Sequence, residues 1–217
     1  MNLANKLTIF RMILVPIILI IACFNSDKAV LWGSLEASTG IPVTMLLMDL
    51  VFIIASITDK LDGYLARSRN MVTTFGKFLD PLADKILVLS ALIILVQFDK
   101  LPAWVPAIIL TREFLVSGYR LVAVEKGGQV IAASFWGKLK TVTQMLAIII
   151  AFVDIHAFGE FITNGFAMTR LGFVVNVINT VLMSLSVVAT IFSGYDYLKN
   201  GKNFLKITNS FLKGSAL

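Results

Sequence analysis

The stretch Asp59-Lys-Leu-Asp-Gly-Tyr-Leu-Ala-Arg67 is followed, after eight residues, by Gly76-Lys-Phe-Leu-Asp-Pro-Leu-Ala-Asp84. We call residues 59–84 the aspartate motif. Its four carboxylates lie between two strongly apolar runs, residues 41–58 and 86–96. Both runs are typical of membrane-spanning helices. Because a charged side chain at membrane depth costs about 2.5–3.5 kcal/mol, the four carboxylates are expected to have compensating partners.

The spacing of these carboxylates predicts a metal site. On a helix, Asp59 and Asp62 share one face, and Asp80 and Asp84 share one face of the next helix. The polar connection at residues 67–70 lets the two helices run antiparallel, so that the carboxylate pairs face each other. An all-oxygen ligand set suits Mg²⁺ or Mn²⁺, and four carboxylates are enough to hold two ions about 3.5–4 Å apart.

A purely structural interpretation of the same residues is also open. Asp80 could be the N-cap of a helix that begins with Pro81. Asp59, which precedes Lys60, could lie at a solvated helix end. The presence of both carboxylate pairs in one short stretch favours the metal site.

The composition predicts an all-α integral membrane protein. The chain has 217 residues, of which 58% are hydrophobic and 15% are charged, and this excludes an ordinary soluble domain. One membrane domain, residues 1–217, is expected. Its single cysteine, Cys23, excludes a disulfide framework and is predicted to be buried. Six spans are predicted, at residues 7–24, 41–65, 75–96, 104–124, 139–153 and 171–192.

The distribution of positive charge predicts the orientation. Six spans place both termini on one side, and 14 of the 19 Lys and Arg residues lie on that side. The positive-inside rule therefore predicts cytoplasmic termini and a cytoplasmic aspartate motif. The net charge of +6 suits anionic lipid headgroups and phosphorylated substrates, and no pattern indicates nucleic-acid binding. Residues 200–217 are predicted to be a basic amphipathic tail along the interface.

The pattern DxxDGxxAR, eight residues, GxxxDxxxD resembles the signature of the CDP-alcohol phosphotransferase family of membrane enzymes. All eight signature positions match, namely Asp59, Asp62, Gly63, Ala66, Arg67, Gly76, Asp80 and Asp84. The resemblance implies transfer of a substituted phosphate from a CDP-linked donor to an alcohol, with release of CMP. It also implies a homodimer.

The resemblance assigns roles position by position. Asp59, Asp62, Asp80 and Asp84 would hold the metal ions, and Asp84 would also be the general base for the acceptor hydroxyl. The donor CDP-diacylglycerol would be bound by residues of the motif and of the N-terminal stretch, namely Gly63, Ala66, Arg67, Thr73, Gly76, Asn5 and Thr8.

The acceptor is predicted from basic residues outside the motif. Arg112, Arg120, Lys138 and Lys140 could converge into a phosphate receptor, and Arg112 falls near mid-membrane, where arginine is usually functional. The sequences around them resemble the branch of the family that uses glycerol 3-phosphate. Residues 195–197, Tyr-Asp-Tyr, are interpreted as an interfacial anchor.

Other interpretations of these residues remain open. Arg112 could form a structural ion pair with Glu113, the two lysines could belong to a solvated rim, and Thr8 and Arg11 could cap the first helix at the interface. The acceptor could instead be inositol phosphate or phosphatidylglycerol. A more distant alternative is a divalent-cation transporter that uses the carboxylates as its site.

Overall fold

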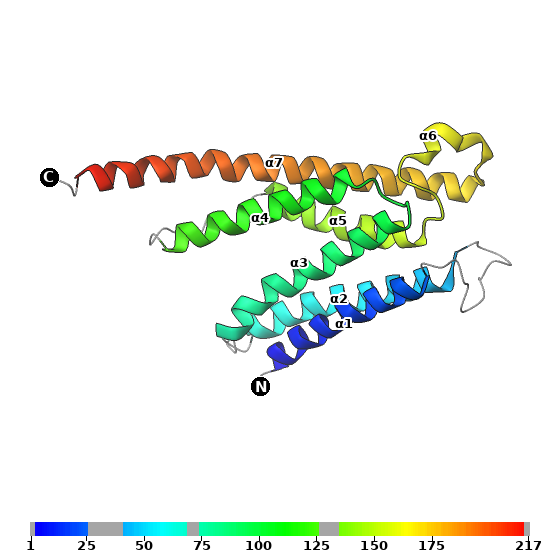
Figure 1. Ribbon diagram of the computed structural model, residues 1–217, viewed down its shortest axis with the longest axis horizontal. Coiled ribbons are helices and arrows are strands. Elements are labelled where there is room, and N and C mark those ends of the chain that lie inside the picture. Colours follow the sequence, from blue (N-terminus) through cyan, green and yellow to red (C-terminus); the bar gives the residue numbers. More distant parts are fainter. Residues whose placement is uncertain (1–2, 26–40, 69–73, 126–134, 215–217) are drawn as a thin grey trace.

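The computed structural model describes residues 3–25, 41–68, 74–125 and 135–214, and all of the elements in these ranges are helices (Figure 1). Side chains are described within residues 8–23, 41–58, 82–119 and 135–199. The expected all-α fold is confirmed. The elements are α1 (Leu3–Asn25), α2 (Val43–Ser68), α3 (Thr74–Gln97), α4 (Trp104–Glu125), α5 (Phe135–Val153), α6 (Glu160–Asn164), the 3₁₀ turn η1 (Gly165–Ala167) and α7 (Arg170–Gly214).

Six long helices run back and forth along one axis in the described part of the chain, in two groups of three (Figure 1). In one group α1 packs against α2 and α3, and in the other α7 packs against α4 and α5. The groups meet where α2 contacts α5 and where α3 contacts α4 and α5. The end of α2, the start of α3 and both chain termini lie at one end of the bundle, which we call the motif end (Figure 1).

The contact between the two groups is apolar. Phe52 of α2 and Phe152 of α5 are fully buried, and their ring centroids are 6.3 Å apart. Ile18 of α1 and Leu87 of α3 are also fully buried in the same core. Between helices surrounded by lipid, such side chains stabilise the packing through close van der Waals contact, and these contacts fix the spacing of the helices that carry the aspartate motif.

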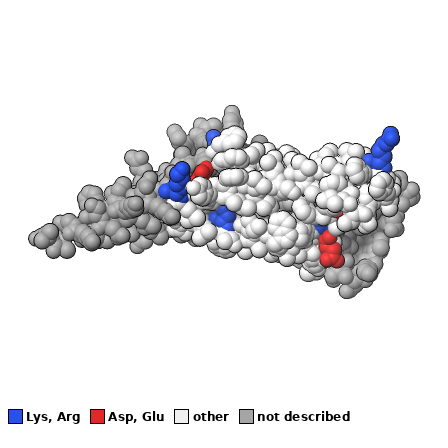
Figure 2. Space-filling view, turned by 90° about the horizontal axis from the view of Figure 1, so that it is seen from above, with Lys and Arg blue, Asp and Glu red and all other residues white. Residues whose placement is uncertain are grey.

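The outer surface of the bundle is also apolar. Large hydrophobic side chains such as Ile20, Ile57 and Val181 are more than half exposed, and the face in Figure 2 is uncharged between charged residues near its two ends. Soluble monomers rarely expose apolar surface on this scale. By length and composition, two described helical stretches could cross a membrane, Phe135–Val153 and Arg170–Lys199, with mean hydropathies of 1.3 and 2.0. The expectation of six spans stays a prediction.

Two local interpretations of the sequence are wrong. Cys23 is exposed rather than buried, because it lies on the outward face of α1. Asp80 and Pro81 do not begin a helix, since α3 already begins at Thr74. Residues 200–214 of the expected basic tail continue α7, which runs unbroken to Gly214, and their place along the interface stays a prediction. No proline interrupts residues 170–214, so the backbone has no required break there.

A short turn joins α3 to α4 at the end of the bundle opposite the motif. The N–H of Lys100 bonds the carbonyl of Leu95 at 2.9 Å, and the N–H of Asp99 bonds the carbonyl of Val96 at 3.1 Å. Asp99 has φ 56°. These two bonds with a left-handed residue form a Schellman motif, which satisfies the last carbonyls of α3 and reverses the chain.

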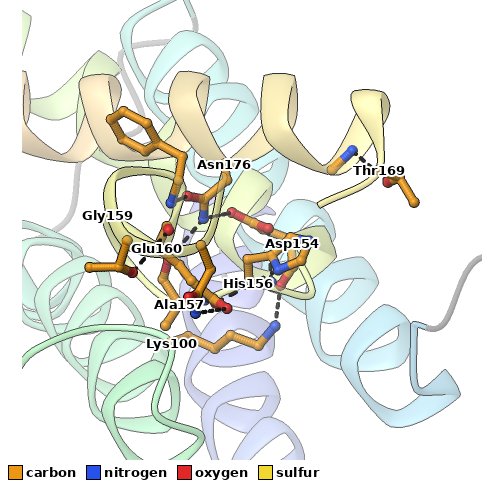
Figure 3. Close-up of polar contacts among 12 residues, drawn as sticks. Lys100, Asp154, His156, Ala157, Gly159, Glu160, Thr169 and Asn176 are labelled. Carbon is orange, nitrogen blue, oxygen red and sulfur yellow. Dashed lines mark hydrogen bonds and ion pairs between the residues drawn. The ribbon is translucent and has the colours of Figure 1, made fainter. Parts of the chain in front are cut away.

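At the same end, the buried carboxylate of Asp154 fastens the connection from α5 to α7 (Figure 3). Its oxygens accept hydrogen bonds from the N–H of His156 at 3.0 Å and from the side-chain amides of Asn176 at 2.9 Å and Asn179 at 3.2 Å. Lys100 donates to the backbone carbonyl of Asp154. One residue therefore joins α5, α7 and the turn between α3 and α4.

The chain between Asp154 and α7 is held by local bonds around His156 (Figure 3). The N–H of Ala157 donates to the Glu160 carboxylate at 2.8 Å and lowers the pKa of Glu160. A Cβ at Gly172 would lie 2.8 Å from Nε2 of His156, so the imidazole packs where α7 has no side chain. His156 is thus a structural residue of this connection, at the end of the bundle opposite the motif.

Replacement of Asp154 by Asn is expected to destabilise the fold. The substitution replaces one carboxylate oxygen, which accepts hydrogen bonds, with an NH₂ group that would face other N–H donors. Buried hydrogen bonds to a charged group contribute about 1.5–3 kcal/mol each. We expect the melting temperature in detergent to fall clearly. The matched control is Asp99→Asn, because Asp99 is exposed and Asn tolerates its left-handed backbone. Equal melting temperatures for the two variants would contradict this account of Asp154.

Candidate active site

The aspartate motif spans two neighbouring helices. Asp59 and Asp62 lie in the second half of α2, Asp80 and Asp84 lie in the first half of α3, and the two helices contact each other. The helical backbone confirms the expected i,i+3 and i,i+4 placement of each pair. Asp84 is half-buried. The side chains of the other motif residues lie outside the described residues, namely Asp59, Asp62, Gly63, Ala66, Arg67, Thr73, Gly76 and Asp80.

Next to the motif, one carboxylate binds two cations from different helices. Oε1 of Glu113 in α4 accepts a hydrogen bond from Arg112 at 3.0 Å and another from Nζ of Lys140 in α5. The side chains of Arg112 and Lys140 are only 13% and 7% exposed. Burial weakens screening by solvent, so these charges interact more strongly than a surface pair would.

Helix α7 completes the surroundings of Arg112. The guanidinium donates to the hydroxyl of Ser193, and its central carbon lies 5.7 Å from the centroid of the Tyr197 ring. Ser193 and Tyr197 are one turn apart, so both face α4 from the same side of α7. Trp136 at the start of α5 stacks on Phe192 with centroids 4.9 Å apart. The three helices are thus joined at the level of Arg112.

The cluster continues to α3 and so to the motif. Nζ of Lys85 donates to the hydroxyl of Ser117 in α4, and the charge of Lys85 acts on Glu113. The charge of Asp84 acts on Lys140. We call Lys85, Arg112, Glu113 and Lys140 the cationic cluster. With three cations to one carboxylate, it can attract an anion beside the proposed base, Asp84.

Comparison with known families decides the class of this protein. The family model described as CDP-alcohol phosphatidyltransferase matches residues 1–192. The chain belongs to this family. The CDP-alcohol phosphatidyltransferase match includes the whole aspartate motif and the cationic cluster, together with α7 as far as Phe192.

Relatives with assigned names are similar over nearly their whole length. A CDP-diacylglycerol–glycerol-3-phosphate 3-phosphatidyltransferase of Bacillus subtilis is 44% identical over 96% of this chain and 99% of the relative. A protein of the same name from Haemophilus influenzae is 35% identical over 94% of this chain and 95% of the relative. A probable phosphatidylglycerophosphate synthase of Mycobacterium tuberculosis is 38% identical over 91% and 80%.

The structure places the residues predicted from the N-terminal stretch in α1. Thr8 and Arg11 are buried, at 1% and 0% exposure, so the alternative in which they only cap the helix at a solvated interface is wrong. The side chain of Asn5 lies outside the described residues. The charge of a buried arginine requires compensating partners. Arg11 does take part in interactions within the fold.

Of the four basic residues predicted to bind the acceptor, the structure describes three side chains and separates Lys138 from the other two. Arg112 and Lys140 meet in the cationic cluster, whereas Lys138 is exposed. Residues two apart on a helix do not share a face, which explains why Lys140 turns inward and Lys138 outward. The rim interpretation is therefore wrong for Lys140. The side chain of Arg120 lies outside the described residues.

The sequence alone does not identify several residues of the site, or it predicts another role for them. Lys85 directly follows Asp84 in the sequence, and this position beside the motif is the signal that could have identified it as a residue of the site. Tyr197 was interpreted as an interfacial anchor, but it is 4% exposed and packs on Arg112, while Tyr195 is 61% exposed. The ion pair between Arg112 and Glu113, considered as a structural alternative, is present. This ion pair does not exclude a role of Arg112 in binding the acceptor phosphate, because the carboxylate of Glu113 is shared with Lys140.

Proposed function

We propose that the protein transfers a phosphatidyl group from CDP-diacylglycerol to glycerol 3-phosphate, which gives phosphatidylglycerophosphate and CMP. The names of the relatives support both substrates. The observation that supports a phosphorylated acceptor is the cationic cluster, because buried Lys140 interacts electrostatically with Asp84 and shares the carboxylate of Glu113 with the largely buried Arg112. An acceptor with its own phosphate would be held there while its hydroxyl group faces the base.

The proposed reaction balances as one displacement at phosphorus. Asp84 takes the proton of the glycerol C1 hydroxyl. The resulting oxygen attacks the phosphorus that bears diacylglycerol, and the bond from this phosphorus to the oxygen that bridges the two phosphates breaks. CMP leaves with that bridging oxygen. Arg112 and Lys140 hold the acceptor phosphate throughout, because guanidinium gives directional contacts and ammonium gives a compact charge.

The donor set of the motif fits a divalent metal. Four aspartates on two adjacent helices offer only oxygen ligands, which Mg²⁺ and Mn²⁺ prefer. In this proposal Asp59, Asp62, Asp80 and Asp84 hold two such ions, which neutralise phosphate charge when bound. Gly63, Ala66, Arg67, Thr73, Gly76, Asn5 and Thr8 remain the residues proposed to bind CDP-diacylglycerol.

The proposed setting is a plasma membrane crossed six times, with the motif on the cytoplasmic side. The back-and-forth course of the six long helices in the described ranges supports it (Figure 1). The excess of Lys and Arg at the motif end supports the orientation. CDP-diacylglycerol would then enter from the inner leaflet and glycerol 3-phosphate from the cytoplasm. A homodimer is part of the proposal by family resemblance alone.

The test is CMP release by the purified protein in detergent, with CDP-diacylglycerol and Mg²⁺ or Mn²⁺. Glycerol 3-phosphate, inositol phosphate, inositol, serine and phosphatidylglycerol are offered one at a time. We expect release with glycerol 3-phosphate alone. Release with a different acceptor would overturn the acceptor assignment and keep the reaction class. Flux of metal ions across vesicles without CMP release would favour the transporter.

A further inference from the structure

We propose that Glu113 is a positioning residue for the acceptor phosphate, and that its carboxylate holds Arg112 and Lys140 together as one receptor. This inference rests on the proposed function, because it concerns the same acceptor. Glu113 itself carries the wrong charge to bind a phosphate. Its expected effect is therefore indirect, through the two cations that it binds.

Glu113 lies between two positive charges that come from different helices. Arg112 comes from α4 and Lys140 from α5, and Oε1 of Glu113 accepts hydrogen bonds from both. Two buried cations repel each other strongly where solvent does not screen them. A carboxylate between them offsets that repulsion before the substrate arrives. Without it, Lys140 would be expected to turn away from Arg112.

Arg112 and Lys140 both have more hydrogen-bond donors than Glu113 uses. A guanidinium has five N–H donors and an ammonium has three. Glu113 uses one donor of each cation, and Ser193 uses one more of Arg112. Nε of Arg112 is buried with no hydrogen-bond partner among the described residues. Both cations thus keep donors for a second anion while they stay bound to Glu113.

The net charge of the cationic cluster suits a bound phosphate. Lys85 also acts on Glu113, so the cationic cluster carries three positive charges and one negative charge. A phosphate monoester carries about −1.5 to −2 at neutral pH. A bound acceptor phosphate would nearly neutralise the cluster with Glu113 still in place. Displacement of Glu113 by the phosphate would instead leave a largely buried carboxylate without its partners, which is costly.

Helix α7 also holds Arg112 in place. The hydroxyl of Ser193 accepts one guanidinium bond and the Tyr197 ring faces the guanidinium carbon. A Cβ added at Gly194 would lie 3.5 Å from Cγ of Arg112, which is ordinary contact. Glu113 and α7 therefore restrain the same side chain from two directions, as a precise receptor requires.

Glu113→Gln tests the inference, because glutamine keeps the shape and removes the charge. We expect the KM for glycerol 3-phosphate to rise at least about tenfold, with the KM for CDP-diacylglycerol changed less than about twofold. Competitive inhibition by inorganic phosphate should weaken in parallel. Glu113→Asp, which keeps the charge on a shorter side chain, should recover part of the loss. Glu160→Gln is the matched control at the opposite end of the bundle, with both KM values unchanged.

The possible outcomes separate this inference from the proposed function. If the wild-type protein does not use glycerol 3-phosphate, the proposed function itself fails. If the wild type uses it and Glu113→Gln leaves its KM unchanged, only the role of Glu113 fails. A lower KM would mean that Glu113 occupies the place of the phosphate, which also overturns the inference. Should Glu113→Gln not fold, Ser193→Ala replaces it, with a smaller rise in the same KM expected and an unchanged KM counting against the receptor.

Discussion

Asp84→Asn is expected to lower kcat for CMP release by about 10²- to 10⁴-fold, the usual contribution of a general base. Asn is isosteric with Asp but cannot take a proton from the acceptor hydroxyl at neutral pH. Asp84 is the one carboxylate of the motif whose side chain is described, and its charge reaches Lys140 in the cationic cluster. It therefore lies where a base for a phosphate-bearing acceptor is needed.

The measurement for Asp84 is the initial rate of CMP release at saturating concentrations of both substrates. Asp99→Asn is the control, because it makes the same chemical change at an exposed turn at the opposite end of the bundle. Melting temperatures of both variants in detergent establish that they are folded. A folded Asp84→Asn protein with the wild-type rate would remove Asp84 from the reaction.

Arg112→Lys is expected to raise the KM for glycerol 3-phosphate by about 10- to 100-fold, with little effect on the KM for CDP-diacylglycerol. Lysine keeps the charge but cannot contact Glu113, Ser193 and a phosphate at once in the planar geometry of guanidinium. The stacking on Tyr197 would also be lost. The comparison of the two KM values therefore separates the effect of Arg112 on binding the acceptor phosphate from any effect on binding CDP-diacylglycerol.

Arg170→Lys is the matched control for Arg112, because Arg170 is exposed at the start of α7. It should leave both KM values at the wild-type level. Equal increases in the two KM values of Arg112→Lys would mean that Arg112 supports the whole site and not the acceptor phosphate. In that case glycerol 3-phosphate would need another receptor, with the exposed Lys138 as the next candidate.

Much of the fold follows from the sequence, because long apolar runs bounded by polar residues leave few alternatives to helices. Trp104 and Val153 begin and end helices as predicted. The short helix α6 was not predicted, since five residues with no apolar repeat give little periodic signal. The continuation of α7 beyond Lys199 was missed because its charge resembles that of a surface tail.

The site could be predicted only where its residues are close in sequence. The aspartate motif has a fixed spacing within two helices and needs no tertiary information. The partners of Arg112, by contrast, include Ser193, which is 81 positions away, and Lys140 is 27 positions from Glu113. Helical phase shows that Ser193 and Tyr197 share a face of α7, but not that this face meets α4. That contact is a result of the packing of three helices.

The reaction at the centre of this account can be tested with glycerol 3-phosphate that carries ¹⁸O at its C1 hydroxyl. The purified protein is incubated with this acceptor and CDP-diacylglycerol, and the products are identified by mass spectrometry. We expect a lipid with two phosphate groups that retains the ¹⁸O atom, together with unlabelled CMP. Phosphatidic acid as the lipid product, or a product lipid without ¹⁸O, would contradict attack by the acceptor hydroxyl and with it the proposed function.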